Sequence, residues 1–453
     1  MTSPGPDGGP GGASAAAARG VWEEFVARHP RTSSVDLILP DLAGIARGKR
    51  LAASAFAAMV ESGFTFASSL YGMDATGANV EASGLIWEEG DADRPGVLDL
   101  DTLAPVPWRE GAAQVLGGLL DHDGRPFFAD PRALVRRLLE ALRERDLHGV
   151  AAFELEFHLL DPELSPPRPL SAGQPGQVYG LDALVPAETF LRTLERYAEV
   201  QGLPIKGAVS EYAPGQLEIN LGHQGDALRA ADHAFLLKRA VKAAARSAGA
   251  AATFMALPFE GGSTSGMHLH LSLTDAAGAN RFAREPDLLR HAVGGLQATM
   301  AEAMLLFAPN PNSFRRLRPR SYAPTSPAWG RNNRTVAIRI PAGPEAARRI
   351  EHRTAGADAS PYLVLAGVLA GILHGLDHAI EPDQPVTGNG YDRPATLPLS
   401  LEHALDAFSA STALPGLLGE RFCRLHLACR RAERDRFNDR VTPTEQAWYL
   451  HTV

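Results

Sequence analysis

The chain of 453 residues has only two cysteines, Cys423 and Cys429, which excludes a disulfide framework. Its most apolar segment, Leu363 to Leu373, is much shorter than the roughly 20 residues that span a bilayer. Basic residues are not in excess, and a net charge of −8 argues against nucleic acid or an anionic membrane as partner. The first 18 residues, rich in Gly, Pro, Ala and Ser, lack the apolar core of a signal peptide. We therefore expect a cytoplasmic protein with a disordered tail over residues 1–18.

Common catalytic signatures are missing as well. The chain has no Gly-x-x-x-x-Gly-Lys-Ser/Thr phosphate loop and no Gly-x-Ser-x-Gly nucleophile elbow. No cysteine–histidine pair suggests a covalent nucleophile. If a nucleotide binds, metal ions and arginines must hold its phosphates.

The length predicts two domains rather than a single core. Segments 35–40 and 45–50 flank a short turn and predict a hairpin, and further strands are expected near 63–69 and 113–120. We expect a small, mostly β domain over 19–122, ending in the turn-rich connector Asp121 to Pro126, and a larger mixed domain over 123–453. In the larger domain, Asp130 and Asp226 are expected to cap helices, and the proline-rich segment 309–330 to form a lid or binding loop.

What the chain does have is a set of metal-suited side chains on short segments with strand-like alternation. Alternate strand residues share one face, so Glu154 and Glu156 point the same way, and His268, His270 and Ser272 form a second such row. Clustered carboxylates repel one another unless cations lie between them. A set rich in oxygen donors favours Mg²⁺ or Mn²⁺, and six ligands suffice for two ions. The predicted ligands are Glu154, Glu156, Glu211, Glu218, His268 and Glu351. The competing interpretation is that the histidines are ordinary strand residues facing solvent.

Arginines gather next to these segments. Arg339 lies between apolar neighbours in the predicted strand 335–340, whereas Arg315, Arg318 and Arg348 fit a solvated basic surface. Guanidinium groups bind carboxylates and phosphates with two hydrogen bonds. Beside a metal cluster they indicate an anionic substrate and phosphoryl transfer.

Five motifs occur in the order found in the glutamine synthetase family, which this chain resembles over nearly everything after residues 1–18. They are Glu154-Leu-Glu156, Glu211-Tyr-Ala-Pro-Gly-Gln-Leu-Glu218, Gly266-Met-His268-Leu-His270, Asn312-Ser-Phe-Arg-Arg316 and Arg349-Ile-Glu351-His-Arg353. The resemblance implies an α+β fold, with an N-terminal β-grasp domain and a catalytic domain whose antiparallel sheet forms a funnel surrounded by helices. It also implies that ATP activates the glutamate side chain as γ-glutamyl phosphate, which an amine then attacks.

The resemblance implies a role for each matching residue. One metal site would consist of Glu156, Glu211 and Glu218, and the other of Glu154, His268 and Glu351. Arg316 and Arg353, with Arg334 and Thr264, would bind glutamate. Arg334 and Arg339 would neutralise the transferring phosphoryl group, with Tyr322 as a further catalytic residue. The ATP set would be His270, Ser272, Arg339 and Arg349.

Two departures bear on the amine. Ammonia-using members have a flap sequence Gly-Tyr-Glu-Ala-Pro, whereas this chain reads Arg320-Ser-Tyr322-Ala-Pro, so Tyr322 replaces the glutamate. They also have an ammonium-binding aspartate where this chain has Ala67. The flap resembles that of the γ-glutamyl-polyamine and γ-glutamyl-ethanolamide synthetases, which implies a larger amine. Thr264 replaces a flexible glycine of the glutamate loop, so a related acid stays an alternative to glutamate.

Other readings stay open at this stage. The chain could be an ordinary glutamine synthetase that uses Asp74 for ammonium, a non-catalytic assembly of the same shape, or a carboxylate–metal hydrolase. The resemblance implies a homo-oligomer, a dodecamer of two hexameric rings. A regulatory adenylylation tyrosine is not evident, so no such control is expected.

Overall fold

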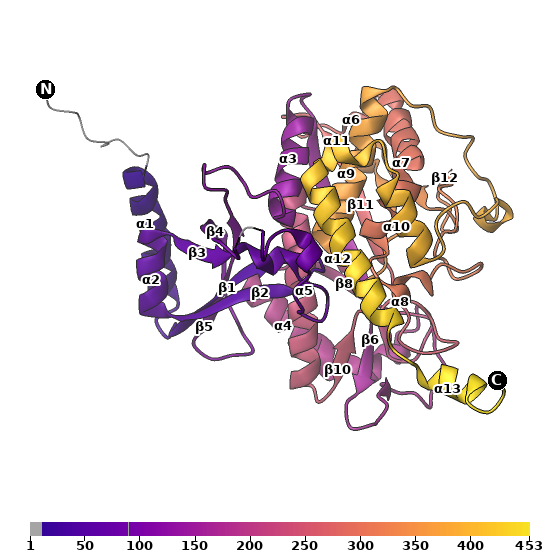
Figure 1. Cartoon of the computed structure of the whole chain (residues 1–453), viewed down its shortest axis with the longest axis horizontal. Helices are drawn as coiled ribbons and strands as arrows, with labels where there is room; N and C mark the ends of the chain where they lie inside the picture. Colours follow the sequence, from indigo (N-terminus) through magenta and orange to yellow (C-terminus); the bar gives the residue numbers. More distant parts are fainter. Residues whose placement is uncertain (1–10, 89) are drawn as a thin grey trace, which may run out of the picture.

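The computed structural model describes residues 11–88 and 90–453 and contains two sheets (Figure 1). The first sheet has five strands in the order β2-β1-β5-β4-β3 and lies at the left of Figure 1. Strands β1 and β5 are parallel, and the other neighbours are antiparallel. The strands are β1 Ser34–Pro40, β2 Ala46–Ala52, β3 Phe64–Ala67, β4 Asp93–Pro105 and β5 Ala112–Leu119.

The predicted hairpin is confirmed as β1 and β2, in which Asp36 is opposite Arg50. The expected tail is wrong over residues 11–18, which begin helix α1 (Gly11–Arg28), while residues 1–10 lie outside the described part of the chain. The alanines at 15–18 explain this difference, because alanine has the highest intrinsic helix propensity. Trp22 of α1 then packs edge-on against Phe56 of α2 (Ala53–Ser62) and stacks with Phe25 of its own helix.

The second sheet has nine strands and is built around the long strand β6 (His148–Asp161). Its main path is β12-β13-β14-β11-β6-β9-β8, and β7 and β10 pair with the end of β6. The sheet is antiparallel except for β12 and β13, which run parallel, so the expectation of a purely antiparallel sheet is wrong there. The remaining strands are β7 Arg168–Pro169, β8 Ile205–Ser210, β9 Gln216–Leu221, β10 Ala251–Thr253, β11 Met267–Thr274, β12 Trp329–Arg331, β13 Ile338–Ile340 and β14 Ile350–His352.

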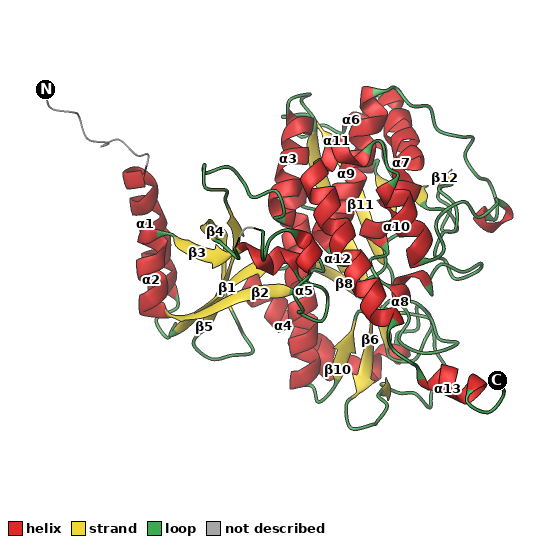
Figure 2. Ribbon diagram, viewed as in Figure 1, coloured by secondary structure: helices red, strands yellow, loops and turns green. Residues whose placement is uncertain are grey.

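Helices surround this sheet, as the colouring in Figure 2 shows. The predicted caps are confirmed: Asp130 accepts hydrogen bonds from the backbone of Arg132 and Ala133, and Asp226 accepts one from Leu228. Residues 363–373 form the buried middle of α9, which packs against α3, α5 and α7. The helices are α3 Pro131–Arg143, α4 Glu188–Gln201, α5 Ala227–Ser247, α6 Arg281–Arg284, α7 Pro286–Phe307, α8 Pro311–Phe314, α9 Pro361–Asp377, α10 Leu401–Ser409, α11 Leu414–Leu418, α12 Glu420–Asn438 and α13 Pro443–Tyr449.

Short 3₁₀ segments link several of these elements. They are η1 Ser68–Gly72, η2 Glu81–Ser83, η3 Asp182–Ala187, η4 Glu345–Ala347 and η5 Gly390–Asp392. Among the described residues, no helix has the length and apolar character needed to cross a membrane.

Candidate active site

Strand register brings the predicted ligands to one face of the large sheet. In β6 and β9, Glu156 is opposite Glu218, and in β6 and β11, Glu154 is opposite His268. In β11 and β14, His270 is opposite Glu351. The alternating apolar residues Phe153, Leu155 and Phe157 are fully buried on the other face, as the two-residue period predicts.

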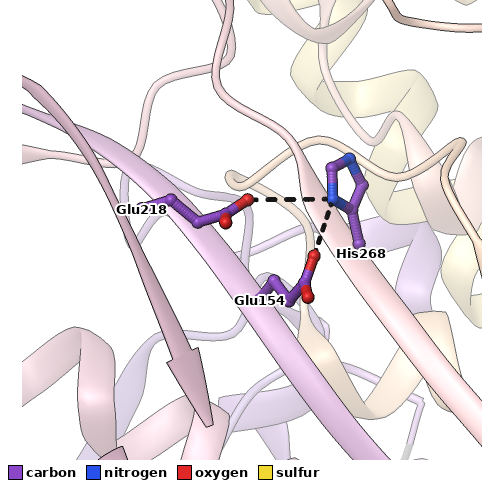
Figure 3. A group of neighbouring side chains, drawn as sticks. All are labelled: Glu154, Glu218 and His268. Atoms are coloured by element: carbon purple, nitrogen blue, oxygen red, sulfur yellow. Dashed lines mark hydrogen bonds and ion pairs between the residues drawn. The ribbon is translucent and has the colours of Figure 1, made fainter. Parts of the chain in front are cut away.

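Three groups of side chains on this face have ligand atoms within 4.8 Å of one another. They are Glu156–Glu211–Glu218, Glu154–Glu218–His268 and Glu154–His270–Glu351. The first is the predicted set. The second and third differ from the predicted set of Glu154, His268 and Glu351, because Glu218 reaches His268 and His270 takes the place next to Glu351. Figure 3 shows the second group: Nδ1 of His268 lies 3.2 Å from Glu154 and 3.9 Å from Glu218.

His270 was predicted to bind nucleotide, but its ring lies among the acidic side chains. Nε of Arg349 donates a hydrogen bond to Nδ1 of His270 at 3.1 Å. The other ring nitrogen, Nε2, lies 3.0 Å from Oε1 of Glu154. Because Nδ1 accepts a hydrogen bond, Arg349 fixes which nitrogen faces the carboxylates, as outer-sphere partners of metal-binding histidines do.

The pKa values of these carboxylates are shifted in opposite directions. Burial, and then the nearby Glu154 and Glu156, raise the pKa of Glu218 to about 9. Burial and the neighbouring Glu156 likewise raise the pKa of Glu211 to about 7. Burial also opposes the charge on Glu154, but hydrogen bonds with His268 and His270 outweigh it and hold its pKa well below the usual range.

This donor set fits divalent cations. The raised pKa values of Glu211 and Glu218 show that the protein places too little positive charge beside them to stabilise their ionised forms. A bound cation would supply that charge. Five carboxylates and two histidines without a thiolate suit a hard or borderline ion.

Two arginines converge on Glu351. Arg353 pairs with its Oε1, and Nη1 of Arg339 lies 2.5 Å from its Oε2. Although Glu351 is buried, the charge of Arg353, with smaller contributions from the histidines and Arg339, lowers its pKa to about 2. Arg316, also buried, donates to the carbonyls of Thr354 and Arg353 at 2.8 and 3.2 Å.

Each of these three guanidinium groups keeps binding capacity. The Nε atoms of Arg316, Arg339 and Arg353 are buried and have no hydrogen-bond partner among the described residues. Guanidinium donors of this kind suit an anion. The arrangement can therefore hold a carboxylate or phosphate beside a cluster of cations.

The other predicted site residues lie around this centre. Arg334 donates a hydrogen bond to the hydroxyl of Tyr179 at 2.7 Å. Tyr179 lies in the proline- and glycine-rich loop after β7. Ser272 is buried in β11, outside all three donor groups. The carbonyl of Thr264 accepts a hydrogen bond from Gln216 at 3.0 Å. Sequence reasoning missed Tyr179, for which the only signal was a lone aromatic residue in a loop of turn formers.

Tyr322 lies at the rim of the site and stacks on Tyr212, with ring centroids 5.7 Å apart and planes 22° from parallel. Tyr212 was also missed, although it directly follows the predicted ligand Glu211. Asp74, the alternative ammonium ligand, is fully buried and already bound within the chain. Its side chain caps a turn at Thr76 and Ala78 and pairs with Arg436 at 2.7 Å.

Comparisons with known proteins agree with this geometry. Residues 128–449 match the family model described as "Glutamine synthetase, catalytic domain". The chain is 41% identical to a gamma-glutamylputrescine synthetase of Escherichia coli (strain K12), over 94% of each chain. It is 34% identical to a gamma-glutamylethanolamide synthetase of Streptomyces coelicolor, over 91% of each chain.

A third relative is a glutamate–isopropylamine ligase of a Pseudomonas species, which is 31% identical over 95% of this chain and 97% of the relative. Among solved structures, a complex of GmaS with ADP superposes with a TM-score of 0.82 at 29% identity. That match covers 94% of this chain and 98% of the other.

Proposed function

Because the chain belongs to the glutamine synthetase family, we propose that it is an ATP-dependent ligase that joins the γ-carboxylate of glutamate to an organic amine. The observation that carries this proposal is the row of metal-suited carboxylates and histidines flanked by Arg316, Arg339 and Arg353. Relatives named as ligases for putrescine, isopropylamine and ethanolamine support an organic amine rather than ammonia.

The reaction would proceed in two transfers. A γ-carboxylate oxygen of glutamate attacks the terminal phosphorus of ATP, and ADP leaves. The amine nitrogen then attacks the acyl carbon, inorganic phosphate leaves, and the nitrogen loses a proton to form the amide. Bound Mg²⁺ or Mn²⁺ would supply positive charge that neutralises the phosphate oxygens.

We assign the chain's own residues to these transfers as follows. Glu156, Glu211 and Glu218 would hold one ion, and Glu154, His268, His270 and Glu351 would hold the remainder, with Arg349 orienting His270. Arg316 and Arg353 would bind glutamate, with Thr264 beside it. Arg334 and Arg339 would stabilise the transferring phosphoryl group, because positively charged guanidinium groups favour the negative charge that develops on its oxygens. Ser272 would contact the nucleotide.

Ammonia is the second candidate acceptor. It would need an anionic group near the flap to attract ammonium, but the flap residue is Tyr322, and Asp74 is taken up by Arg436. An organic amine instead gains contact area and cation–π attraction from an aromatic ring. This difference favours the amine.

We extend the proposal to the whole chain on the strength of family membership. The five-stranded sheet would be a β-grasp domain, the division would fall between residues 122 and 123, and the protein would work in the cytoplasm as a dodecamer of two hexameric rings. Light scattering on purified protein tests the assembly, and a monomer would contradict it.

The activity is tested by ADP release from ATP and glutamate in the presence of Mg²⁺ or Mn²⁺ and a panel of amines. We expect amine-dependent ADP release together with a γ-glutamyl amide identified by mass spectrometry. Ammonium and an amine-free reaction are the controls. Absence of amine-dependent ADP release, or ammonium outperforming every organic amine, would contradict the proposal.

A further inference from the structure

We infer that the cavity under the flap selects amines that carry one positive charge and disfavours diamines. This inference rests on the proposed function and specifies its amine. It concerns a cavity of about 340 Å³ between the flap and the loop before β11. Its polar lining consists of Tyr212, Ser263, Thr264, Arg318, Arg320 and Tyr322, with Ser321 beside them.

The cavity adjoins the proposed reacting centre. Tyr212 directly follows Glu211, which belongs to the first donor group, and the carbonyl of Thr264 binds the side chain of Gln216 in β9. On the flap side, the hydroxyl of Ser321 donates to the carbonyl of Arg316 at 2.9 Å. An amine in this cavity would therefore lie between the glutamate-binding arginine and the first donor group.

The two tyrosines supply an aromatic surface for an ammonium group. About half of each side chain is exposed to solvent, 51% for Tyr212 and 45% for Tyr322. The backbone holds Tyr212 in place, because a Cβ on Gly176 would lie only 1.9 Å from its carbonyl oxygen, so only glycine fits there. The carbonyl of Ala323 accepts a hydrogen bond from Tyr391 at 3.0 Å, which anchors the residue after Tyr322.

Charge in the cavity is of one sign. Arg318 and Arg320 line it, neither pairs with a carboxylate among the described residues, and none of its lining residues is acidic. One ammonium group can lie over the aromatic surface and lose its proton on reaction. A second ammonium group on the same molecule would remain charged among two guanidinium groups, which repel it.

The backbone conformation at Arg320 supports a functional role for its positive charge. Arg320 has φ +63° and Tyr322 has φ +58°, the left-handed region that favours glycine. The flap sequence of ammonia-using family members has glycine at the position of Arg320. Here an arginine occupies a backbone conformation that costs it energy, and its guanidinium group lines the cavity.

The inference predicts a preference different from that in the name of the 41% identical γ-glutamylputrescine synthetase. Three amines with the same four-carbon chain isolate the effect of the distal group: butylamine, 1,4-diaminobutane and 4-aminobutanoate. At low salt we expect kcat/KM for butylamine to exceed that for 1,4-diaminobutane at least tenfold. We expect 4-aminobutanoate to equal or exceed butylamine. Raising the salt should narrow both differences, because salt screens exposed charges.

Variants assign the effect to the flap. The double variant Arg318→Gln/Arg320→Gly should raise kcat/KM for 1,4-diaminobutane relative to butylamine at least fivefold, while the KM for ATP stays unchanged. Arg315→Gln is the matched control, because Arg315 is exposed on the same segment but does not line the cavity. Tyr212→Ala should raise the KM for butylamine more than it lowers kcat, and Tyr212→Phe should restore it.

The outcomes separate the two proposals. If butylamine and 1,4-diaminobutane react equally well, or the double variant leaves their ratio unchanged, the selectivity inference is wrong and the ligase proposal stands. If no amine reacts at all, both are wrong. A change of ratio in Arg315→Gln equal to that in the double variant would assign the effect to overall charge and overturn the role of the cavity.

Discussion

Glu218 is a candidate metal ligand whose burial lowers the stability of the metal-free fold. Its side chain is 12% exposed, it lies among three other glutamates, and its pKa is raised to about 9 by burial and by their charge. A group whose pKa is raised on folding binds more protons in the folded than in the unfolded state. As pH rises from 4.5 to about 9, the metal-free fold therefore loses stability, because Glu218 keeps its proton in the folded state but loses it in the unfolded state.

Replacing Glu218 with glutamine should separate activity from stability. Glu218→Gln removes a carboxylate from two donor groups, so we expect amine-dependent ADP release to fall at least 100-fold. In metal-free protein at pH 8 the same change should raise the free energy of unfolding by roughly 1–3 kcal/mol, because glutamine, unlike Glu218, does not have to take up a proton when the chain folds. Urea unfolding measures this, with the exposed Glu199→Gln as control. A metal-free variant less stable than the parent would contradict the explanation.

At the same scale, the sequence identified the polar face of the sheet but not which residues meet on it. Alternation places Glu154, His268 and His270 on known sides of their strands, and the structure confirms this. Which of these side chains lie next to one another depends on the register between strands. The sequences of the separate strands do not reveal that register. The sequence therefore did not show that Glu218 approaches His268, nor that Tyr179 reaches Arg334 from a loop.

Between elements, a buried ion network joins the first sheet to three helices of the larger part of the chain. Arg132 on α3 binds both carboxylate oxygens of Asp232 on α5, at 2.8 and 2.9 Å, and reaches Asp99 on β4 at 2.5 Å. Tyr362 on α9 donates to Asp232 at 2.9 Å. The first sheet is thus tied to α3 through Asp99, and this guanidinium group is one of the contacts that hold the sheet in place. Arg229 and Arg239 on α5 make others, at 3.6 Å from Asp99 and 3.7 Å from Asp36.

Removing that guanidinium group should be strongly destabilising. Arg132→Ala leaves Asp232, which is 1% exposed, without its main partner, and we expect a loss of about 3–5 kcal/mol in the free energy of unfolding. Arg136→Ala is the control and should change stability much less, because Arg136 lies on the same helix and lines, with Arg132, a cavity between β4 and α5. Chemical denaturation measures both. Equal losses would mean that helix packing rather than the buried charge is responsible.

Elements with local signals were predictable and those without were not. The capping residues Asp130 and Asp226 predicted the starts of α3 and α5, and the two-residue period predicted β6 and β11. The three-residue strand β12 is too short for a period to be recognised, and its parallel pairing with β13 needs long-range contacts. The alternation of residues 350–353, by contrast, predicts the equally short strand β14. Strand β4 was also missed, because its apolar and polar residues follow an irregular pattern broken by a bulge after Asp99.

For the molecule as a whole, stability should depend on metal and pH together. Glu211 and Glu218 have pKa values raised to about 7 and about 9, so the metal-free fold loses stability as pH rises from 4.5 through these values. Glu351 has a lowered pKa of about 2, and its contribution is present above pH 4.5 and lost only as pH falls toward 2. Protons therefore compete with cations between pH 6 and pH 8.

We accordingly expect Mn²⁺ or Mg²⁺ to raise Tm by several degrees more at pH 8 than at pH 6, because cations bind the deprotonated carboxylates. Differential scanning calorimetry with and without the metal, at matched ionic strength, tests this. EDTA should return Tm to the metal-free value at both pH values. The same Tm increase at both would show that these carboxylates do not hold the ion.

Two of the acidic side chains serve more than one donor group: Glu154 and Glu218 each belong to two of the three. A carboxylate that turns toward one ion changes its direction and its charge for the next. The binding of one ion would therefore change the affinity of the site for the next ion. The ions would fill the row cooperatively rather than independently. Arg353 and Arg339, which we propose bind glutamate and the transferring phosphoryl group, both pair with Glu351 at the end of this row. Ions bound in the row would therefore affect the binding of both substrates through Glu351.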